Sequence, residues 1–206
     1  MFHVTFYIRR LHSICGIVPM GLFLLEHVLT NAEAIGGPAA FNEAIGKIAM
    51  IPHNIMLVIE IFGLAIPFLF HMIYGLYIAL QARNNPTKYG YARNWQFALQ
   101  RWTAIFLFVF LIIHVVDLRI FTKGGGTPIS YALLDQMFNN MGWFILYLVG
   151  MIAAIFHFCN GVTTLCMTWG IAKGPRIQTF IGRVMMLVCV LLSLATIAFM
   201  ASYKMH

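Results

Sequence analysis

Five long apolar segments dominate this chain of 206 residues and decide the environment in which it can fold. They cover roughly residues 11–29, 55–81, 97–121, 141–169 and 180–202. A helix needs about 20 apolar residues to cross a bilayer, and within lipid it satisfies its own backbone hydrogen bonds. Each segment is long enough for this, so the sequence predicts an all-α membrane protein with five transmembrane helices.

The composition agrees with a lipid environment. Only 9% of the residues are charged and 61% are hydrophobic, whereas a soluble protein carries about 25% charged residues. The spans and their connections use the whole chain, so we expect one membrane domain, residues 1–206, with no separate soluble domain. Glu26 and His27 interrupt the first segment and no A-x-A-like cleavage site follows, so we expect a retained span and not a cleaved signal.

The connections between spans differ in length and charge. Residues 31–54 form a long connection with room for a short amphipathic helix near residues 40–49, and a second connection on the same side contains Gly124-Gly125-Gly126. Basic residues gather in cytoplasmic loops, and they favour the side of the N-terminus. The sequence therefore predicts a multi-pass membrane protein with its N-terminus in the cytoplasm. The basic residues on the N-terminal side are Arg9, Arg10, Arg83, Lys88, Arg93, Arg101, Lys173, Arg176 and Arg183, against Lys47, Arg119, Lys123 and Lys204 opposite.

Two other function classes find no support in the sequence. The net charge is +7, but no continuous basic tract of the kind used for nucleic-acid binding is present. The four cysteines form neither a CxxC nor a CxxCH motif, which argues against covalently attached haem and against a zinc ribbon. We expect the cysteines to be small buried hydrophobic residues.

Four of the eight histidines lie one to a span, at His27, His71, His114 and His157, with separations of 44, 43 and 43 residues. At 1.5 Å per residue, His27 and His114 lie ~21 Å and ~22 Å along the outward-running first and third spans. The other two lie ~24–26 Å along the inward-running second and fourth spans, near the cytoplasmic end. The histidines therefore fall on an outer and an inner level, roughly 15 Å apart.

Two matched levels are the arrangement required for two b-type haems, each with two histidine ligands. A haem iron takes axial ligands on opposite faces of the porphyrin, and imidazole is a common one. If the first four spans form an up-down bundle, diagonal helices face each other across its axis, where a cofactor can lie. Gly75 and Gly161 each follow an inner histidine by four residues, on the same helical face, where they would let a haem approach.

The histidines and glycines also have interpretations that involve no haem. Glycine is a common packing residue in membrane helices, and a lone histidine within a membrane is often only packed and hydrogen-bonded. A haem-free proton or ion transporter could use the histidines as a relay, and a structural anchor would leave them without a role. Neither alternative requires matched depths.

Three acidic residues, Glu26, Glu60 and Asp117, lie near the outer level. A quinone takes up two electrons and two protons, so a quinone site needs a proton route beside its electron carrier. One hypothesis is a quinone pocket near the outer haem, with these acids as proton carriers. An equally good interpretation is that they pair with Lys47, Arg119 or Lys123 at the membrane interface.

Haem propionates need cationic partners. The inner-level candidates are Arg9, Arg10, His12, Arg101 and Arg183, and the outer-level candidate is Arg119. Binding to anionic lipid headgroups would explain the same residues without a haem.

Several short motifs, in this order, resemble one known family over nearly the whole chain. They are Phe6-Tyr7-Ile8-Arg9-Arg10-Leu11-His12-Ser13 with Gly16 and Glu26-His27, then Phe70-His71-Met72-Ile73-Tyr74-Gly75-Leu76-Tyr77, Asn84-Asn85, Tyr91-Ala92-Arg93-Asn94-Trp95 and Gln100-Arg101-Trp102-Thr103. Together they resemble the di-haem, b558-type cytochrome b subunit of succinate:menaquinone oxidoreductases and fumarate reductases.

This resemblance implies five membrane helices and two non-covalent haems b, held by His27 with His114 and by His71 with His157. It also implies flavoprotein and iron–sulfur subunits on the cytoplasmic face, with succinate or fumarate handled on the flavoprotein and menaquinone in the membrane. A cytochrome b subunit of a hydrogenase or formate dehydrogenase is the nearest alternative. A quinone site at the cytoplasmic end, around His12 and Ser13, is a second possibility for the pocket.

Overall fold

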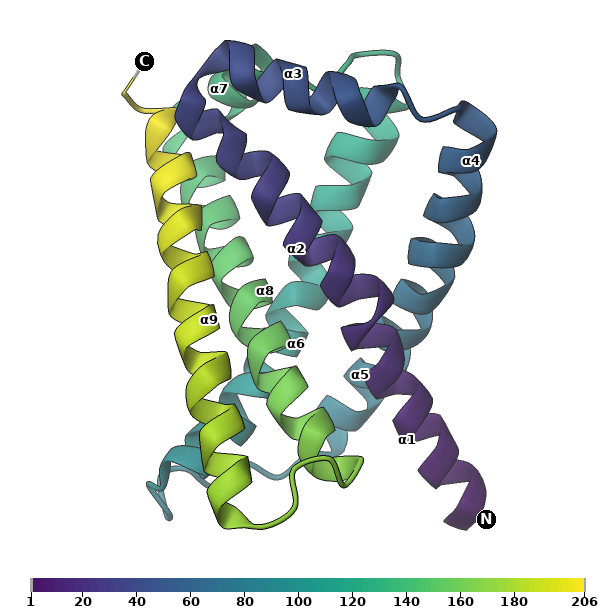
Figure 1. Cartoon of the computed structure of the whole chain (residues 1–206), viewed down its shortest axis with the longest axis vertical. Coiled ribbons are helices and arrows are strands. Elements are labelled where there is room, and N and C mark those ends of the chain that lie inside the picture. Colours follow the sequence, from purple (N-terminus) through teal and green to yellow (C-terminus); the bar gives the residue numbers. More distant parts are fainter. Residues whose placement is uncertain (1, 206) are drawn as a thin grey trace.

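The computed structural model describes residues 2–205, with side chains from residue 5 to residue 205. Every regular element in this part of the chain is a helix (Figure 1). Five helical stretches are long and apolar enough to cross a membrane, which confirms the predicted fold class. They are Thr5–Gly36, His53–Gln81, Ala92–Lys123, Met141–Thr168 and Pro175–Ser202.

The first span consists of two helices, α1 (Phe2–Ile17) and α2 (Pro19–Ala32), followed by the short 3-10 turn η1 (Glu33–Gly36). Pro19 has no N–H group to donate to the preceding turn, so the helix is interrupted at this point. The span begins earlier and ends later than the apolar segment 11–29.

The second and third spans each contain a π-helical segment in the half that lies away from the N-terminus. The second runs through α4 (His53–Val58), the π-helix η2 (Ile59–Ala65) and α5 (Ile66–Gln81). Pro67 near the start of α5 cannot donate to the carbonyl of Gly63, which favours a wider turn before it. The third runs through α6 (Ala92–His114) and the π-helix η3 (Val115–Lys123). Such segments are rare and are often found at functional sites.

Helices α8 (Met141–Thr168) and α9 (Pro175–Ser202) form the last two spans. The side chain of Asn140 caps α8 by accepting from the backbone N–H groups of Gly142 and Trp143. Gly174, with φ of 82°, precedes the proline that begins α9. A turning glycine followed by proline sets the sharp entry into this helix.

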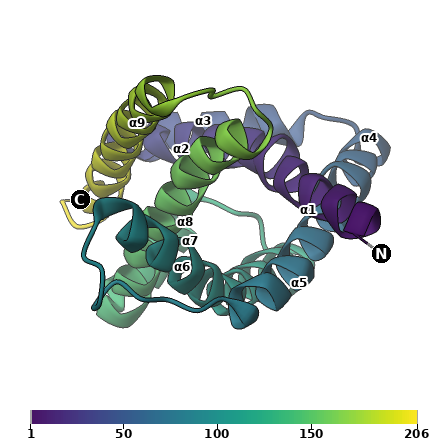
Figure 2. The same cartoon turned by 90° about the horizontal axis from the view of Figure 1, so that it is seen from below.

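The helices α1, α5, α6 and α8 surround a common axis, as the view along the bundle shows (Figure 2). Helix α9 lies outside this ring and packs on α8 and α2. The N-terminus and C-terminus lie at opposite ends of the molecule (Figure 1). The first four spans therefore form the up-down bundle, and the fifth supports one side of it.

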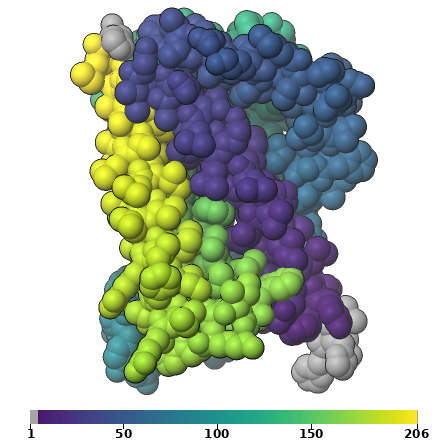
Figure 3. Space-filling model, in the orientation of Figure 1, coloured from purple at the N-terminus to yellow at the C-terminus, as the bar shows by residue number. Residues whose placement is uncertain are grey.

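Two short helices cover the end of the bundle opposite the N-terminus. Helix α3 (Pro38–Ala49) lies across this end (Figure 3), in the connection where an amphipathic helix was expected. Helix α7 (Tyr131–Asn139) was not expected, although Ser130 caps it by accepting from the N–H of Leu133. The two helices share a buried aromatic cluster with the end of α9, and burial raises the pKa of both Tyr131 and Tyr203.

Candidate functional site: two histidine pairs

The structure brings the four span histidines together as two pairs. The ring centroids of His71 and His157 lie 6.2 Å apart with the rings at 88°, and we call these two residues the inner pair. The ring centroids of His27 and His114 lie 5.8 Å apart with the rings at 79°, and we call these the outer pair. The structure thus pairs the histidine of the second span with that of the fourth, and the histidine of the first span with that of the third. These are the pairs that the depth argument predicts.

The separation within each pair fits two axial ligands of one metal ion. A metal–imidazole bond of about 2 Å on each side, plus the distance from nitrogen to ring centre, places the two ring centres about 6 Å apart. No group of three or more His, Cys, Asp or Glu residues suited to a metal ion occurs in the described part of the chain. A donor set of two imidazoles is the set that haem iron takes, because the porphyrin supplies the remaining ligands.

Hydrogen bonds engage the Nδ1 atom of each ring of the inner pair. The Nδ1 atom of His71 lies 2.9 Å from the backbone carbonyl oxygen of His12, which can only accept, so Nδ1 carries the proton. The Nδ1 atom of His157 lies 3.1 Å from the hydroxyl oxygen of Thr103. In this arrangement the Nε2 lone pair of each inner ring remains available. Histidine ligands of metals characteristically donate their second ring N–H in this way.

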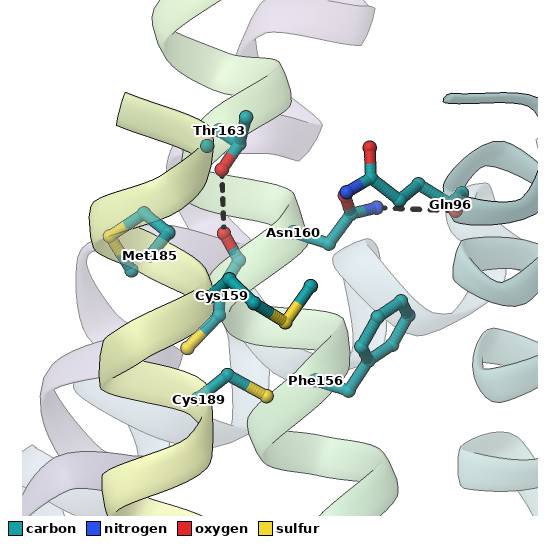
Figure 4. Close-up of a pocket in the computed structure, with 9 residues that line it drawn as sticks. Gln96, Phe156, Cys159, Asn160, Thr163, Met185 and Cys189 are labelled. Carbon is teal, nitrogen blue, oxygen red and sulfur yellow. Dashed lines mark hydrogen bonds between the residues drawn. The ribbon is translucent and has the colours of Figure 1, made fainter. Parts of the chain in front are cut away.

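A seam of polar side chains joins α6 to α8 beside the inner pair. The side-chain amide of Gln100 donates to the backbone carbonyl of His157 at 3.0 Å. Asn160 donates to the amide oxygen of Gln100 at 2.7 Å and to the carbonyl of Gln96 at 3.3 Å. Figure 4 shows Asn160 pointing from α8 toward Gln96 on α6. The seam holds the helix of His157 against α6.

Glycines allow the close approach of α1 and α5 near the inner pair. A Cβ atom at Gly16 would overlap the ring of His71, and one at Gly75 would lie 2.9 Å from Nε2 of His12. The ring of His12 stacks on that of His71, with centroids 4.1 Å apart and 4° between the planes. Gly161 has looser surroundings, since the nearest atom to its Cβ position is Cδ1 of Ile17 at 3.4 Å.

The cationic residues of the inner end differ in how far they are already engaged. The guanidinium of Arg10 lies over the ring of Trp169 at 4.8 Å and donates to the carbonyl of Thr168 at 3.0 Å. Arg101 lies over the ring of Phe97 at 3.2 Å, and its Nε is buried without a partner. The Nε2 of His12 is also buried without a partner. His12 therefore keeps an unused nitrogen atom beside the ring of His71, and Arg101 keeps one two residues before Thr103, which contacts His157.

The remaining two basic candidates are exposed to the surroundings. Arg9 is exposed on α1. Arg183 is exposed on α9, outside the ring of helices, where it lines a groove with Arg176 and Thr179. Exposed arginines at this depth suit lipid headgroups as well as any cofactor.

Aromatic side chains surround the outer pair. The ring of Phe23 stacks on His27 at 5.4 Å, and Phe110 stacks on His114 at 5.9 Å. The ring of Tyr147 on α8 approaches His114 at 5.6 Å. The Tyr147 hydroxyl and the Nδ1 atom of His114 are both buried and lack hydrogen-bond partners in the described structure. Sequence reasoning missed Tyr147, although its depth in the fourth span matches that of the outer pair.

The three acidic candidates have different surroundings. Glu60 on η2 forms a two-point ion pair with Arg119 on η3, with an Nη2–Oε2 distance of 2.6 Å and an Nε–Oε1 distance of 3.2 Å. Asp117 is half-buried on η3, three residues after His114. Glu26 is exposed, and its carboxylate accepts from the hydroxyl of Thr30 at 2.5 Å.

Two of the basic residues have acidic partners. Arg119 pairs with Glu60, and a carboxylate in an ion pair can still carry protons. Lys47 instead pairs with Glu43 on the same helix at 2.8 Å, and this contact lowers the pKa of Glu43. Neither Asp117 nor Glu26 forms an ion pair in the described structure.

Comparison with known proteins places the chain in a family. A family model described as "Succinate dehydrogenase/Fumarate reductase transmembrane subunit" matches residues 1–92 and 82–199. The succinate dehydrogenase cytochrome b558 subunit of Bacillus subtilis (strain 168) is 38% identical over 188 residues, which are 91% of this chain and 92% of that protein. These matches confirm the resemblance seen in the sequence motifs, and the chain belongs to the family of succinate dehydrogenase/fumarate reductase transmembrane subunits.

Proposed function

We propose that this chain is the membrane-anchor cytochrome b subunit of a succinate:quinone oxidoreductase, and that it carries electrons between an iron–sulfur subunit and menaquinone. Family membership supports the enzyme class. The observation that supports the electron-transfer role is the presence of two imidazole pairs, with ring centroids 6.2 Å and 5.8 Å apart. Dicarboxylate chemistry then belongs to a partner subunit.

Each histidine pair holds one haem b in this proposal. His71 and His157 would hold the inner haem, and His27 and His114 would hold the outer haem. When bound, each haem supplies a one-electron redox centre. The chain contributes position and orientation, because helices on opposite sides of the bundle axis hold the two rings of each pair.

Unused polar atoms favour two residues as partners of the inner propionates. Arg101 and His12 keep buried nitrogen atoms without partners, and buried polar atoms in proteins are rarely left unpaired. Arg10 and Arg101 each already donate to one backbone carbonyl and lie over one aromatic ring, so the buried Nε is what favours Arg101 over Arg10. Arg119 serves the outer end only if its contact with Glu60 is shared or broken.

The quinone site lies beside the outer pair in this proposal, and Glu60 and Asp117 carry its protons. Glu60 lies on a π-helical segment, seven residues after His53 at the start of the second span, so only a short path separates it from the outer membrane surface. Asp117 follows His114 by less than one π-helical turn, which keeps it close to the electron carrier. Glu26 is exposed and adjacent to His27, and we place it last among the three.

The iron–sulfur and flavoprotein subunits dock on the end that carries the N-terminus. The excess of basic residues at this end supports its placement in the cytoplasm of a bacterial cell. The inner pair lies nearer this end than the outer pair does. The inner haem would then exchange electrons with the iron–sulfur subunit and the outer haem with menaquinone, in succinate oxidation or, in reverse, in fumarate reduction.

A reduced-minus-oxidised absorption spectrum of the purified protein, combined with a haem-to-protein ratio, tests the proposal. We expect two non-covalent low-spin haems b per chain. Mass spectrometry of co-purifying subunits should find a flavoprotein and an iron–sulfur protein. A folded preparation supplied with haem that still binds none would overturn the cytochrome assignment. Co-purification with the subunits of a hydrogenase or formate dehydrogenase would overturn the assignment to a succinate:quinone oxidoreductase.

A further inference from the structure

The hydroxyl oxygen of Thr103 on α6 lies 3.1 Å from Nδ1 of His157 on α8. If Nε2 of His157 binds a haem iron, Nδ1 is the ring nitrogen left for a hydrogen bond. We propose that Thr103 is a positioning residue that accepts the Nδ1–H of His157, fixes its orientation and lowers the reduction potential of the inner haem. This inference rests on the proposed function, since it takes His157 as an axial ligand.

The direction of the hydrogen bond follows from the other contacts of the hydroxyl. The Thr103 hydroxyl lies 2.7 Å from the carbonyl oxygen of Leu99 and 3.2 Å from that of Gln100. Carbonyl oxygens only accept, so the single hydroxyl proton is directed toward the backbone. The lone pairs of the oxygen remain for the N–H of His157 at 3.1 Å. Thr103 thus acts as a fixed acceptor.

A fixed acceptor changes the electronic character of a histidine ligand. A histidine that donates its second ring N–H becomes a more basic ligand. A more basic ligand stabilises the oxidised iron relative to the reduced iron, and hydrogen bonding around the ligands is one of the means by which proteins set a haem potential. Loss of the Thr103 hydroxyl should therefore raise the reduction potential of the inner haem.

The outer pair lacks a comparable acceptor. The Nδ1 atom of His114 is buried without a partner, and no hydrogen bond to the ring of His27 is found among the described residues. A change at Thr103 should therefore affect only one of the two haems. The unaffected outer haem serves as an internal reference in the same sample.

The hydroxyl of Thr103 is not needed to hold the helices together. Gln100 and Asn160 already join α6 to α8 through three hydrogen bonds. The side chain of Thr103 is only half-buried, and valine has nearly the same shape. A Thr103→Val variant should therefore fold and bind both haems.

The experiment is a redox titration of the haem absorption bands in wild type, Thr103→Val and Thr103→Ser, with electron paramagnetic resonance of the oxidised low-spin haems. The matched control is Thr196→Val, because Thr196 also donates to a carbonyl one turn earlier, at 2.9 Å, and contacts no histidine. The inner haem is identified as the component that is lost in His71→Ala.

We expect Thr103→Val to raise the potential of the inner haem and to change its resonance signal, while the outer haem stays unchanged. Thr103→Ser, which keeps the acceptor, should resemble wild type, and so should Thr196→Val. If Thr103→Val prevents haem incorporation, Thr103→Cys provides the same contrast with a weaker acceptor. An unchanged inner potential in a variant with both haems bound, or an equal shift in Thr196→Val, would overturn the inference. Absence of haem from the wild type would instead overturn the proposed function.

Discussion

The inner and outer histidine pairs use the same residue type in the same bundle, but their surroundings differ. The Nδ1 atom of each inner ring lies within hydrogen-bond distance of an oxygen atom, and a polar seam fixes the helix of His157. The outer rings are surrounded by aromatic side chains, and two buried polar atoms beside them, on His114 and Tyr147, have no partner. A shared ligand type therefore does not imply a shared environment.

The helices around the two histidine pairs also differ in their geometry. The inner pair lies on the regular α-helices α5 and α8, and glycines let α1 approach α5 beside it, whereas the outer halves of the second and third spans each contain a π-helical segment. The Glu60–Arg119 ion pair joins these two π-helical segments. In physical terms, the inner site is built to hold a fixed geometry. The outer site contains charged and unsatisfied groups suited to exchanging protons with a ligand.

The largest expected effect comes from removing one histidine of each pair. His71→Ala should lose the inner haem and keep the outer one, and His27→Ala should do the reverse, because each pair supplies its own axial ligands. The haem-to-protein ratio and the redox titration measure both losses. His53→Ala, an exposed residue at the start of α4, is the control and should keep both haems. Two haems retained in either span variant would contradict the division into pairs.

The next effect concerns the outer site alone. Glu60→Gln should slow quinone reduction by about tenfold or more, because a proton carrier next to a redox reaction contributes at least that much to its rate. Reduction of the haems by succinate should persist. Glu43→Gln on α3 is the matched control, since Glu43 is exposed and pairs only with Lys47. Full quinone turnover in Glu60→Gln would remove this residue from the proton route.

A smaller effect should distinguish the inner packing. Gly16→Ala places a methyl group into the ring of His71, and overpacking of this kind typically costs about 1–3 kcal/mol. The inner haem should be bound less tightly or lost on heating before the outer haem. Gly46→Ala on α3, where nothing lies within 4 Å of the new atom, should leave thermal stability unchanged or slightly higher. Equal behaviour of the two variants would show that α1 can move away from His71 without cost.

The smallest expected effect is that of Tyr147→Phe. The hydroxyl of Tyr147 has no partner, so its removal breaks no hydrogen bond and should change the free energy of unfolding by less than about 1 kcal/mol. Tyr131→Phe is the comparison, because its hydroxyl reaches the carbonyl of Ser202 at 3.4 Å. Thermal unfolding measures both. A clear loss of stability or of outer haem in Tyr147→Phe would mean that a bound group uses this hydroxyl.

Depth along a helix is the part of this architecture that the sequence predicts well. The rise per residue is nearly constant, so residue number alone placed His27 level with His114 and His71 level with His157. The number of spans follows from apolar length in the same way. These predictions depend on distances along one helix and not on contacts between helices.

Rotation about the helix axis is the part that the sequence did not predict. Glu26 has the depth of the outer site, but it is exposed, because adjacent residues on a helix point in different directions. The hydrogen bond from His157 to Thr103 depends on how α6 and α8 are turned toward each other, and π-helical segments change that rotation locally. Helix α7 was missed because it has only nine residues and lies between loop-forming residues.

The order of the ligands along the chain has a consequence for the history and engineering of such a protein. The partner of the first histidine is the third, and the partner of the second is the fourth. A cut between the second and third spans would leave each half with one ligand from each pair and with no complete pair. The chain therefore cannot be divided at this point into two halves that each contain a complete histidine pair, and a gene that encoded either half alone would specify neither pair.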